Sequence, residues 1–89
     1  MCMSTENNNF KADILREVGV LPISNTQEYR VLLVRDPELG IRVSLQKWWR
    51  KSKDETWNAG KGFFLDGREC IQIGRWLQEI GSEIIHVKN

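Results

Sequence analysis

Two runs of β-forming residues, joined by a short segment with proline and glycine, constrain the fold of this chain most strongly. Residues 28–35 (EYRVLLVR) are short and rich in residues that favour strands. Residues 41–49 (IRVSLQKWW) begin with the alternation of apolar and polar side chains that a half-buried strand requires. Between them, residues 36–40 (DPELG) have the composition of a tight turn. The two runs are therefore predicted to pair as a β-hairpin.

The C-terminal part of the chain predicts a helix with a defined start. Asp66 and Glu69 stand three residues apart, as in a capping box that begins a helix. The residues that follow carry an apolar stripe at helical spacing. This stripe contains Ile73, Leu77, Ile80 and Ile84, with Trp76 beside it. Directly before the cap, residues 61–65 (KGFFL) predict a last short strand.

The N-terminal part is less regular. Residues 1–9 (MCMSTENNN) are polar and rich in asparagine, which is typical of a disordered tail. The apolar residues of 10–24 fit either a short helix or a strand, although Pro22 favours an extended conformation for the later part. Residues 10–89 are therefore predicted to form one α+β domain, with a four-stranded antiparallel sheet followed by one helix.

The small size of this domain predicts self-association. With 89 residues the chain forms one domain with a small core. One helix does not cover a sheet of four strands well, and dimerisation is a common remedy for so small a core. We expect a homodimer in which the helix packs against its symmetry mate, and Trp76 to lie either in this interface or in the core. The predicted interface residues are Ile73, Trp76, Leu77, Ile80 and Ile84.

Basic and aromatic residues are concentrated in the middle of the chain. The net charge is only +1, yet residues 40–65 hold six basic and two acidic side chains. Three of the four tryptophans, Trp48, Trp49 and Trp57, lie in the same stretch. Aromatic faces stack on bases and basic groups hold phosphates, so this combination favours binding of single-stranded nucleic acid. The alternative is a solvated loop that happens to be basic.

Other classes of function have little support in the sequence. Cys2 and Cys70 show neither a disulfide framework nor metal-ligand spacing, and His86 is the single histidine. Without a Walker A loop or a nucleophile–base spacing, we expect a protein that is not an enzyme and needs no cofactor. No apolar run is long enough to predict a membrane span, and no secretory signal is evident. A reducing compartment is expected.

Three segments carry a resemblance to a known family. They are residues 30–36 (RVLLVRD), residues 41–49 (IRVSLQKWW) and residues 60–65 (GKGFFL), after which the helix begins. Their order and spacing over about 55 of the 89 residues resemble the single-stranded-DNA-binding domain of the transcriptional coactivator positive cofactor 4. The resemblance implies a homodimer whose curved sheets bind single-stranded DNA or melted duplex with little sequence preference.

The same resemblance implies a cellular setting. The chain is similar to a minimal bacterial or phage-type member, because its N-terminal tail is short. Such a protein would act in replication, recombination or transcription regulation, alone or with proteins of those processes. It would do so in the cytoplasm of a bacterium or a phage-infected cell, or in the nucleus if the source is eukaryotic.

The resemblance also implies roles for individual residues. Arg30 and Arg35 match phosphate-contacting positions, Trp49 matches a base-stacking aromatic residue, and Lys61 matches a phosphate-contacting lysine. The chain departs from the family at the hairpin tip, residues 37–40, which lacks basic and aromatic side chains, and at Gln46, where the family has an arginine. The whole predicted DNA-binding set is Arg30, Arg35, Arg42, Lys47, Trp48, Trp49, Arg50, Lys51, Trp57 and Lys61.

The aromatic residues have alternative roles. Trp48 and Trp49 are adjacent, so they point to opposite faces of a strand and at most one belongs to the core. The same reasoning assigns one of Phe63 and Phe64 to the core and the other to an open face. Trp57 either anchors the loop or stacks on a base.

The arginines and the overall function also have alternatives. Arg30 and Arg35 either contact phosphates or pair with Glu28 or Asp36 at the surface, which would contribute little stability. The second class of function is a protein-interaction module, a replication or transcription accessory that binds a protein through the tryptophan-rich basic patch.

Overall fold

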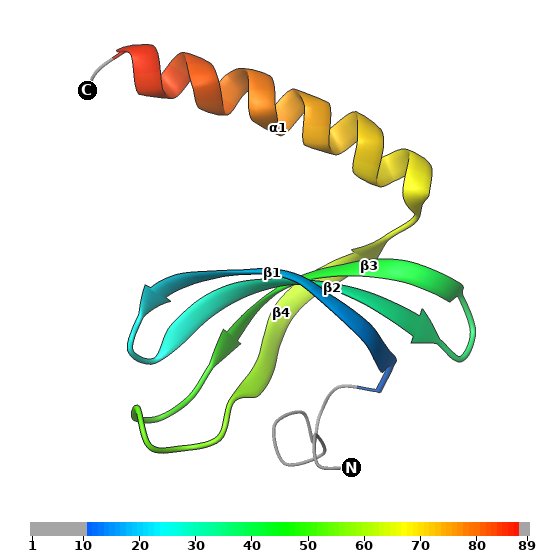
Figure 1. Ribbon diagram of the computed structural model, residues 1–89, viewed down its shortest axis with the longest axis vertical. Coiled ribbons are helices and arrows are strands. Elements are labelled where there is room, and N and C mark those ends of the chain that lie inside the picture. Colours follow the sequence, from blue (N-terminus) through cyan, green and yellow to red (C-terminus); the bar gives the residue numbers. More distant parts are fainter. Residues whose placement is uncertain (1–10, 88–89) are drawn as a thin grey trace.

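The computed structural model describes residues 11–87 and consists of one sheet and one helix (Figure 1). The elements are β1 (Asp13–Ser24), β2 (Gln27–Asp36), β3 (Gly40–Trp49), β4 (Asn58–Leu65) and α1 (Gly67–Val87). All neighbouring strands are antiparallel, and their order in the sheet is their order in the chain. The predicted α+β fold is confirmed. The predicted tail, residues 1–9, lies outside the described residues.

β1 resolves the choice between helix and strand for residues 10–24 in favour of a strand. It pairs with β2 from Asp13 to Ser24, with three register shifts that interrupt the ladder. It lies at an edge of the sheet, where Pro22 costs no hydrogen bond to a further strand. A tight turn leads into β2, and within it the Ser24 hydroxyl accepts a hydrogen bond from the Thr26 amide at 3.2 Å.

The predicted hairpin is formed by β2 and β3, which pair without a register shift. Its turn is closed by the Asp36 side chain, whose Oδ2 accepts hydrogen bonds from the amides of Glu38 and Leu39, each at 2.9 Å. Gly40 follows with a φ of 84°, a left-handed conformation that glycine adopts without strain. The composition that marked this segment as a turn therefore has a specific structural basis.

Two glycines of β4 allow this strand to lie against β3. A Cβ atom at Gly60 would stand 2.5 Å from the Lys47 carbonyl oxygen, and one at Gly62 would overlap the Leu45 carbonyl oxygen and the Gln46 side chain. Gln46 in turn donates a hydrogen bond from Nε2 to the Gly60 carbonyl oxygen at 2.9 Å. β4 is longer than predicted, because it begins at Asn58 rather than at Lys61.

The helix α1 begins as the sequence predicts. The Asp66 carboxylate accepts a hydrogen bond from the Glu69 amide, and Glu69 accepts one from the Asp66 amide, both at 2.9 Å. This reciprocal pair is a capping box. Nearby, burial raises the pKa of the Cys70 thiol, and the carboxylates of Asp66 and Glu69 add to the effect. The thiol is therefore protonated at neutral pH and is a poor nucleophile.

The alternation of side chains gives the sheet two different faces. The face that we call the inner face carries Arg30, Leu32 and Val34 of β2 opposite Gln46, Ser44 and Arg42 of β3, with Trp48 at its end. The core lies on this face and consists of Ala12, Leu32, Val34, Trp48 and Ala59, with Trp57 and Phe64 packed against it. Trp48 is fully buried.

The other face, which we call the helix-side face, is turned toward α1. It carries Val31, Leu33, Val43 and Leu45 in its middle, all of them only half-buried. An open hollow of about 630 Å³ lies between this face and Leu77 of the helix. The helix contacts β3 and β4 but neither β1 nor β2 within the described residues, so it leaves much of this face uncovered (Figure 1).

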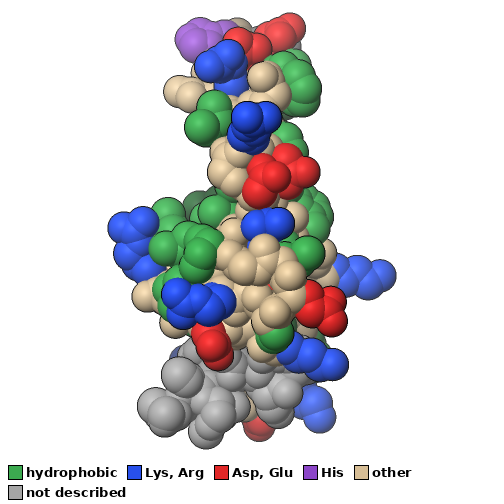
Figure 2. Space-filling view, turned by 90° about the vertical axis from the view of Figure 1, so that its right-hand side faces the viewer, with side chains coloured by type: hydrophobic (Ala, Val, Ile, Leu, Met, Phe, Trp, Pro, Cys, Tyr) green, Lys and Arg blue, Asp and Glu red, His purple; other side chains and the backbone are tan. Residues whose placement is uncertain are grey.

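The helix itself exposes an apolar stripe. Figure 2 shows it rising from the body of the sheet with apolar side chains open along it. Four of the five predicted interface residues are exposed and Ile73 is half-buried. The exposed ones are Trp76, Leu77, Ile80 and Ile84. Trp76 therefore lies outside the core, and the helix and the helix-side face together form one large apolar surface. No helix of the described chain is long and apolar enough to cross a membrane.

Candidate nucleic-acid interface

The structure divides the predicted DNA-binding residues between the two faces and the loop between β3 and β4. Arg30, Arg42 and Trp48 belong to the inner face. Arg35, Lys47 and Trp49 belong to the helix-side face, where Lys61 lines a hollow beside Lys47. Arg50, Lys51 and Trp57 follow β3 and precede β4. Lys and Arg side chains accordingly project from both sides of the body in Figure 2.

An exposed group of basic and aromatic side chains lies at one end of the helix-side face. Tyr29, Lys47, Lys61 and Phe63 line an open hollow of about 210 Å³, with Leu45 in its wall. The Lys47 ammonium group stands 5.5 Å from the centre of the Tyr29 ring, within the range of a cation–π contact. Trp49 lies two residues beyond Lys47 on the same face. We call these residues, Tyr29, Lys47, Trp49, Lys61 and Phe63, the basic–aromatic cluster.

The rings of this cluster are open to solvent. The exposed fraction is 41% for Trp49, 42% for Tyr29 and 56% for Phe63. The expected division of the two phenylalanines is confirmed, because Phe64 packs against the core. The division of the adjacent tryptophans is confirmed as well, with Trp48 in the core and Trp49 exposed.

Sequence reasoning did not include Tyr29 in the predicted set. The signal was present, because Tyr29 stands two residues before Val31 and therefore shares its face. What the sequence alone did not supply was the register that puts Tyr29 directly opposite Lys47. The cluster is thus a product of strand pairing between residues far apart in the chain.

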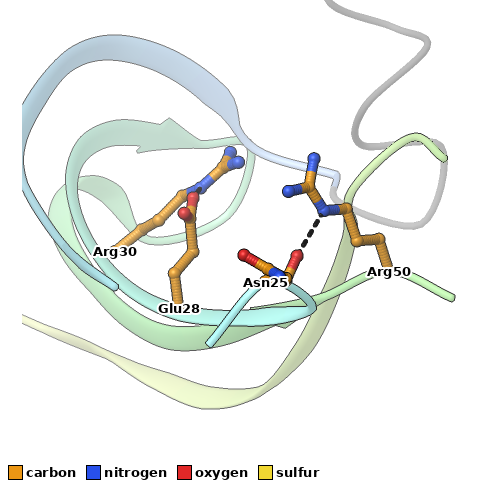
Figure 3. Close-up of polar contacts among 4 residues, drawn as sticks. All are labelled: Asn25, Glu28, Arg30 and Arg50. Carbon is orange, nitrogen blue, oxygen red and sulfur yellow. Dashed lines mark hydrogen bonds and ion pairs between the residues drawn. The ribbon is translucent and has the colours of Figure 1, made fainter. Parts of the chain in front are cut away.

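The inner face holds a second group, in which arginine and tryptophan side chains contact one another. The Arg30 guanidinium stands 4.3 Å from the centre of the Trp48 ring and 5.4 Å from that of Trp57, and the Arg50 guanidinium stands 4.1 Å from that of Trp57. Arg30 also forms an ion pair with Glu28, at 2.6 Å. Figure 3 shows the Arg30 and Arg50 side chains on the concave side of the curved strands.

Both arginines of this group are held by further contacts. Arg50 donates a hydrogen bond from Nε to the Asn25 carbonyl oxygen at 2.8 Å (Figure 3) and from its amide to the Thr26 carbonyl oxygen at 3.0 Å. It thereby joins the start of the β3–β4 loop to the turn between β1 and β2. Arg30 is 7% exposed, and its pairing with Glu28 is the alternative that the sequence left open.

Two predicted contacts need correction on this basis. Trp48 offers no exposed ring on which a base could stack, because the core buries it completely. Arg30 is nearly buried and already paired, so in this conformation it is not an open phosphate contact. The reason is the same for both residues: the even-numbered positions of β2 and β3 face the core, whereas the odd-numbered positions face the helix side.

Arg35 and Arg42 lie at the opposite end of the sheet, beside the β2–β3 turn. Arg35 is six residues from Tyr29 along β2, which corresponds to about 20 Å in an extended strand. Arg42 donates a hydrogen bond from Nη1 to the Ile41 carbonyl oxygen at 2.9 Å. The two arginines therefore lie apart from the basic–aromatic cluster, although a ligand of several nucleotides spans such a distance.

The described chain offers little for other kinds of site. Residues 11–87 contain no group of three or more His, Cys, Asp or Glu side chains that could hold a metal ion. Comparison with protein-family models, with curated proteins and with solved structures found no match to this chain.

Proposed function

We propose that this chain is a homodimeric protein that binds single-stranded DNA without catalysis and with little sequence preference. The observation that carries the proposal is the basic–aromatic cluster, in which exposed rings alternate with lysines on one face of the sheet. Aromatic side chains stack on bases of any sequence, and lysines neutralise the adjacent phosphates. Exposed rings are hard to explain by folding, because large aromatic side chains stabilise a small domain most when they are buried.

The chemistry of the cluster favours single strands over duplex. A base in a duplex is already stacked on both sides, whereas a base in a single strand is free to stack on Trp49, Tyr29 or Phe63. Lys47 and Lys61 line the same hollow as the rings of Tyr29 and Phe63, so phosphates of the same strand come within their reach. Lys51, two residues after Trp49, adds an exposed basic side chain at the start of the β3–β4 loop.

The exposed apolar surface supports the homodimer. A monomer rarely leaves so many large apolar side chains open along a helix and a sheet face. A second copy would bury its helix stripe against this stripe. Self-association through one two-fold axis covers the same apolar surface on both copies at once.

The family assignment is part of the proposal. The three motif segments that resemble positive cofactor 4 form β2, β3 and β4, and a capped helix follows directly. This arrangement supports a member of that family. We further propose that the protein acts in replication, recombination or transcription regulation, in the cytoplasm of a bacterium or an infected host cell or in the nucleus of a eukaryote.

The salt dependence of binding tests the role of the cluster. We expect binding of a 5′-labelled oligo-dT strand of about 20 nucleotides, long enough for one binding site, to weaken as salt rises. Lys61→Ala should reduce the slope of log K against log salt by about 0.7–1, the value for one lost phosphate contact. Arg75→Ala, an exposed helix position away from the cluster, is the matched control and should leave the slope unchanged.

Two outcomes would count against the proposal. An unchanged slope in both Lys61→Ala and Lys47→Ala would mean that the cluster does not contact phosphates. If the wild-type chain binds neither single strand nor duplex, the exposed apolar and aromatic surface would instead belong to a protein-interaction module.

A further inference from the structure

The side chains around Trp57 form a site whose walls are held independently of Trp57 itself. Arg30 is fixed by its ion pair with Glu28, and Arg50 is fixed by the carbonyl oxygen of Asn25. The fully buried Trp48 ring lies beneath Arg30, at 4.3 Å from the guanidinium carbon to the ring centre. None of these contacts involves Trp57, so two arginines and one indole would keep their positions if the Trp57 ring moved away.

Trp57 stands where an exposed loop joins the sheet. It is the last residue before β4, and the six residues that precede it, 51–56, are all exposed. Within this stretch the Glu55 amide donates a hydrogen bond to the Ser52 carbonyl oxygen at 3.0 Å, a local turn that does not tie the loop to the sheet. The Trp57 ring is half-buried and rests against the core and the two arginines. Its displacement would leave every ladder of the sheet intact.

The contacts of the Trp57 ring are those that a nucleobase would make. A guanidinium group stacks on a base as readily as on an indole, because both present a flat π-face. A base in this place would bring its own phosphate beside Arg50 and Lys51, an attraction that the indole cannot supply. Arg30 is nearly buried and ion-paired with Glu28, so it would offer the base the flat face of its guanidinium group rather than a phosphate contact.

We propose that the Trp57 indole occupies a base-binding slot between Arg30 and Arg50, and that a base of bound single-stranded DNA displaces it. This inference rests on the proposed function, and it changes the role of Trp57. Sequence reasoning treated Trp57 as a loop anchor or a stacking residue, whereas here it is a competitor of the ligand. The slot takes one nucleotide of a single strand and adds the inner face to the binding surface.

Substitution of Trp57 should raise the affinity for single-stranded DNA, whereas substitution of a residue that contacts the DNA should lower it. Removing a competitor leaves the slot open, so Trp57→Ala should bind a 20-nucleotide oligo-dT about fivefold to tenfold more tightly than the wild-type chain, because the indole no longer competes through its cation–π contacts with Arg30 and Arg50. Trp57→Phe keeps a ring in the slot and should bind within about twofold of wild type. Trp49→Ala, the matched control, should bind more weakly because an exposed stacking ring is lost.

If Trp57→Ala does not fold, ¹⁹F NMR of the wild-type chain tests the displacement of Trp57 directly. With 5-fluorotryptophan incorporated, the four ¹⁹F resonances are assigned by single Trp→Phe substitutions. On addition of oligo-dT, the solvent isotope shift of the Trp57 resonance between H₂O and D₂O should increase, because its ring leaves the slot. The Trp48 resonance should keep the small shift of a buried ring.

The outcomes separate this inference from the proposed function. If the wild-type chain binds and Trp57→Ala binds more weakly, or if the Trp57 resonance becomes more protected, Trp57 is a ligand contact and the displacement is refuted while the proposed function stands. If Trp57→Ala binds and the wild-type chain does not, Trp57 closes the slot without being displaced, and the displacement is refuted. If neither chain binds, both proposals fail together.

Discussion

The substitution Gly62→Ala tests how β4 is held against the rest of the sheet. A Cβ atom at this position would stand 2.6 Å from Gln46 Cα and closer still to the Leu45 carbonyl oxygen. Both neighbours are main-chain atoms of β3, which cannot rotate away as the end of a side chain can. The added methyl group therefore forces β4 away from β3 at the point where Phe63 pairs with Leu45.

The expected change in the free energy of unfolding of Gly62→Ala is the balance of two opposing effects. Overpacking of this kind costs about 1–3 kcal/mol of the free energy of unfolding. Replacing glycine by alanine in a strand also reduces the entropy of the unfolded chain, which favours the variant by roughly 0.5–1 kcal/mol. At Gly19 on β1 only the second effect operates, because no atom lies within 4 Å of the position of a Cβ. Gly19→Ala is therefore the matched control, and it should be as stable as wild type or slightly more stable.

Thermal unfolding followed by circular dichroism measures both variants at one chain concentration, since dimerisation makes Tm concentration-dependent. Gly62→Ala should lower Tm by about 4–8 °C for each kcal/mol lost in a domain of this size, whereas Gly19→Ala should not lower it. Equal Tm values for the two variants would refute the packing of β4 described above. A loss confined to Gly62→Ala would give the G-K-G segment a structural role that is separate from any phosphate contact by Lys61.

Three further predictions concern the helix, the dimer and the cluster. Asp66→Ala removes the acceptor of the Glu69 amide and should cost about 1 kcal/mol in urea unfolding; a loss below 0.3 kcal/mol would show that the cap contributes little. Ile80→Glu places a charge in the apolar stripe and should shift sedimentation equilibrium from dimer to monomer, and an unchanged mass would exclude this stripe from the interface. Trp49→Ala should weaken binding of oligo-dT by about 1–3 kcal/mol, whereas Leu39→Ala, also exposed but in the turn before β3, should not; equal effects would remove Trp49 from the site.

The parts of the fold that the sequence predicts well are those that local chemistry decides. The β2–β3 hairpin follows from the alternation in residues 41–49 and from an Asp–Pro–Gly turn that the Asp36 side chain and Gly40 close. The start of α1 follows from two residues, Asp66 and Glu69, that bond to each other. β1 was harder to assign, because it is exposed on both faces and shows no alternation.

The candidate site was less predictable, because it depends on which face carries the core. Arg30 and Arg35 are five residues apart, and an odd spacing in a strand already separates them onto opposite faces. Whether Trp48 or Trp49 is buried depends on Leu32 and Val34 across the sheet, which is a matter of register and not of local sequence. The position of Trp57 depends on how the β3–β4 loop returns, for which the sequence contains no local signal.

Tryptophan fluorescence of the wild-type chain gives the most direct test of single-strand binding. The measurement is a titration with a 20-nucleotide single strand and with its duplex, a length that covers the site sizes of such proteins, at two salt concentrations. We predict strong quenching by the single strand, weaker quenching by the duplex, and a loss of affinity as salt rises. No change in fluorescence with either nucleic acid, at low as well as at high salt, would contradict the proposed function and turn attention to a protein partner for the exposed aromatic surface.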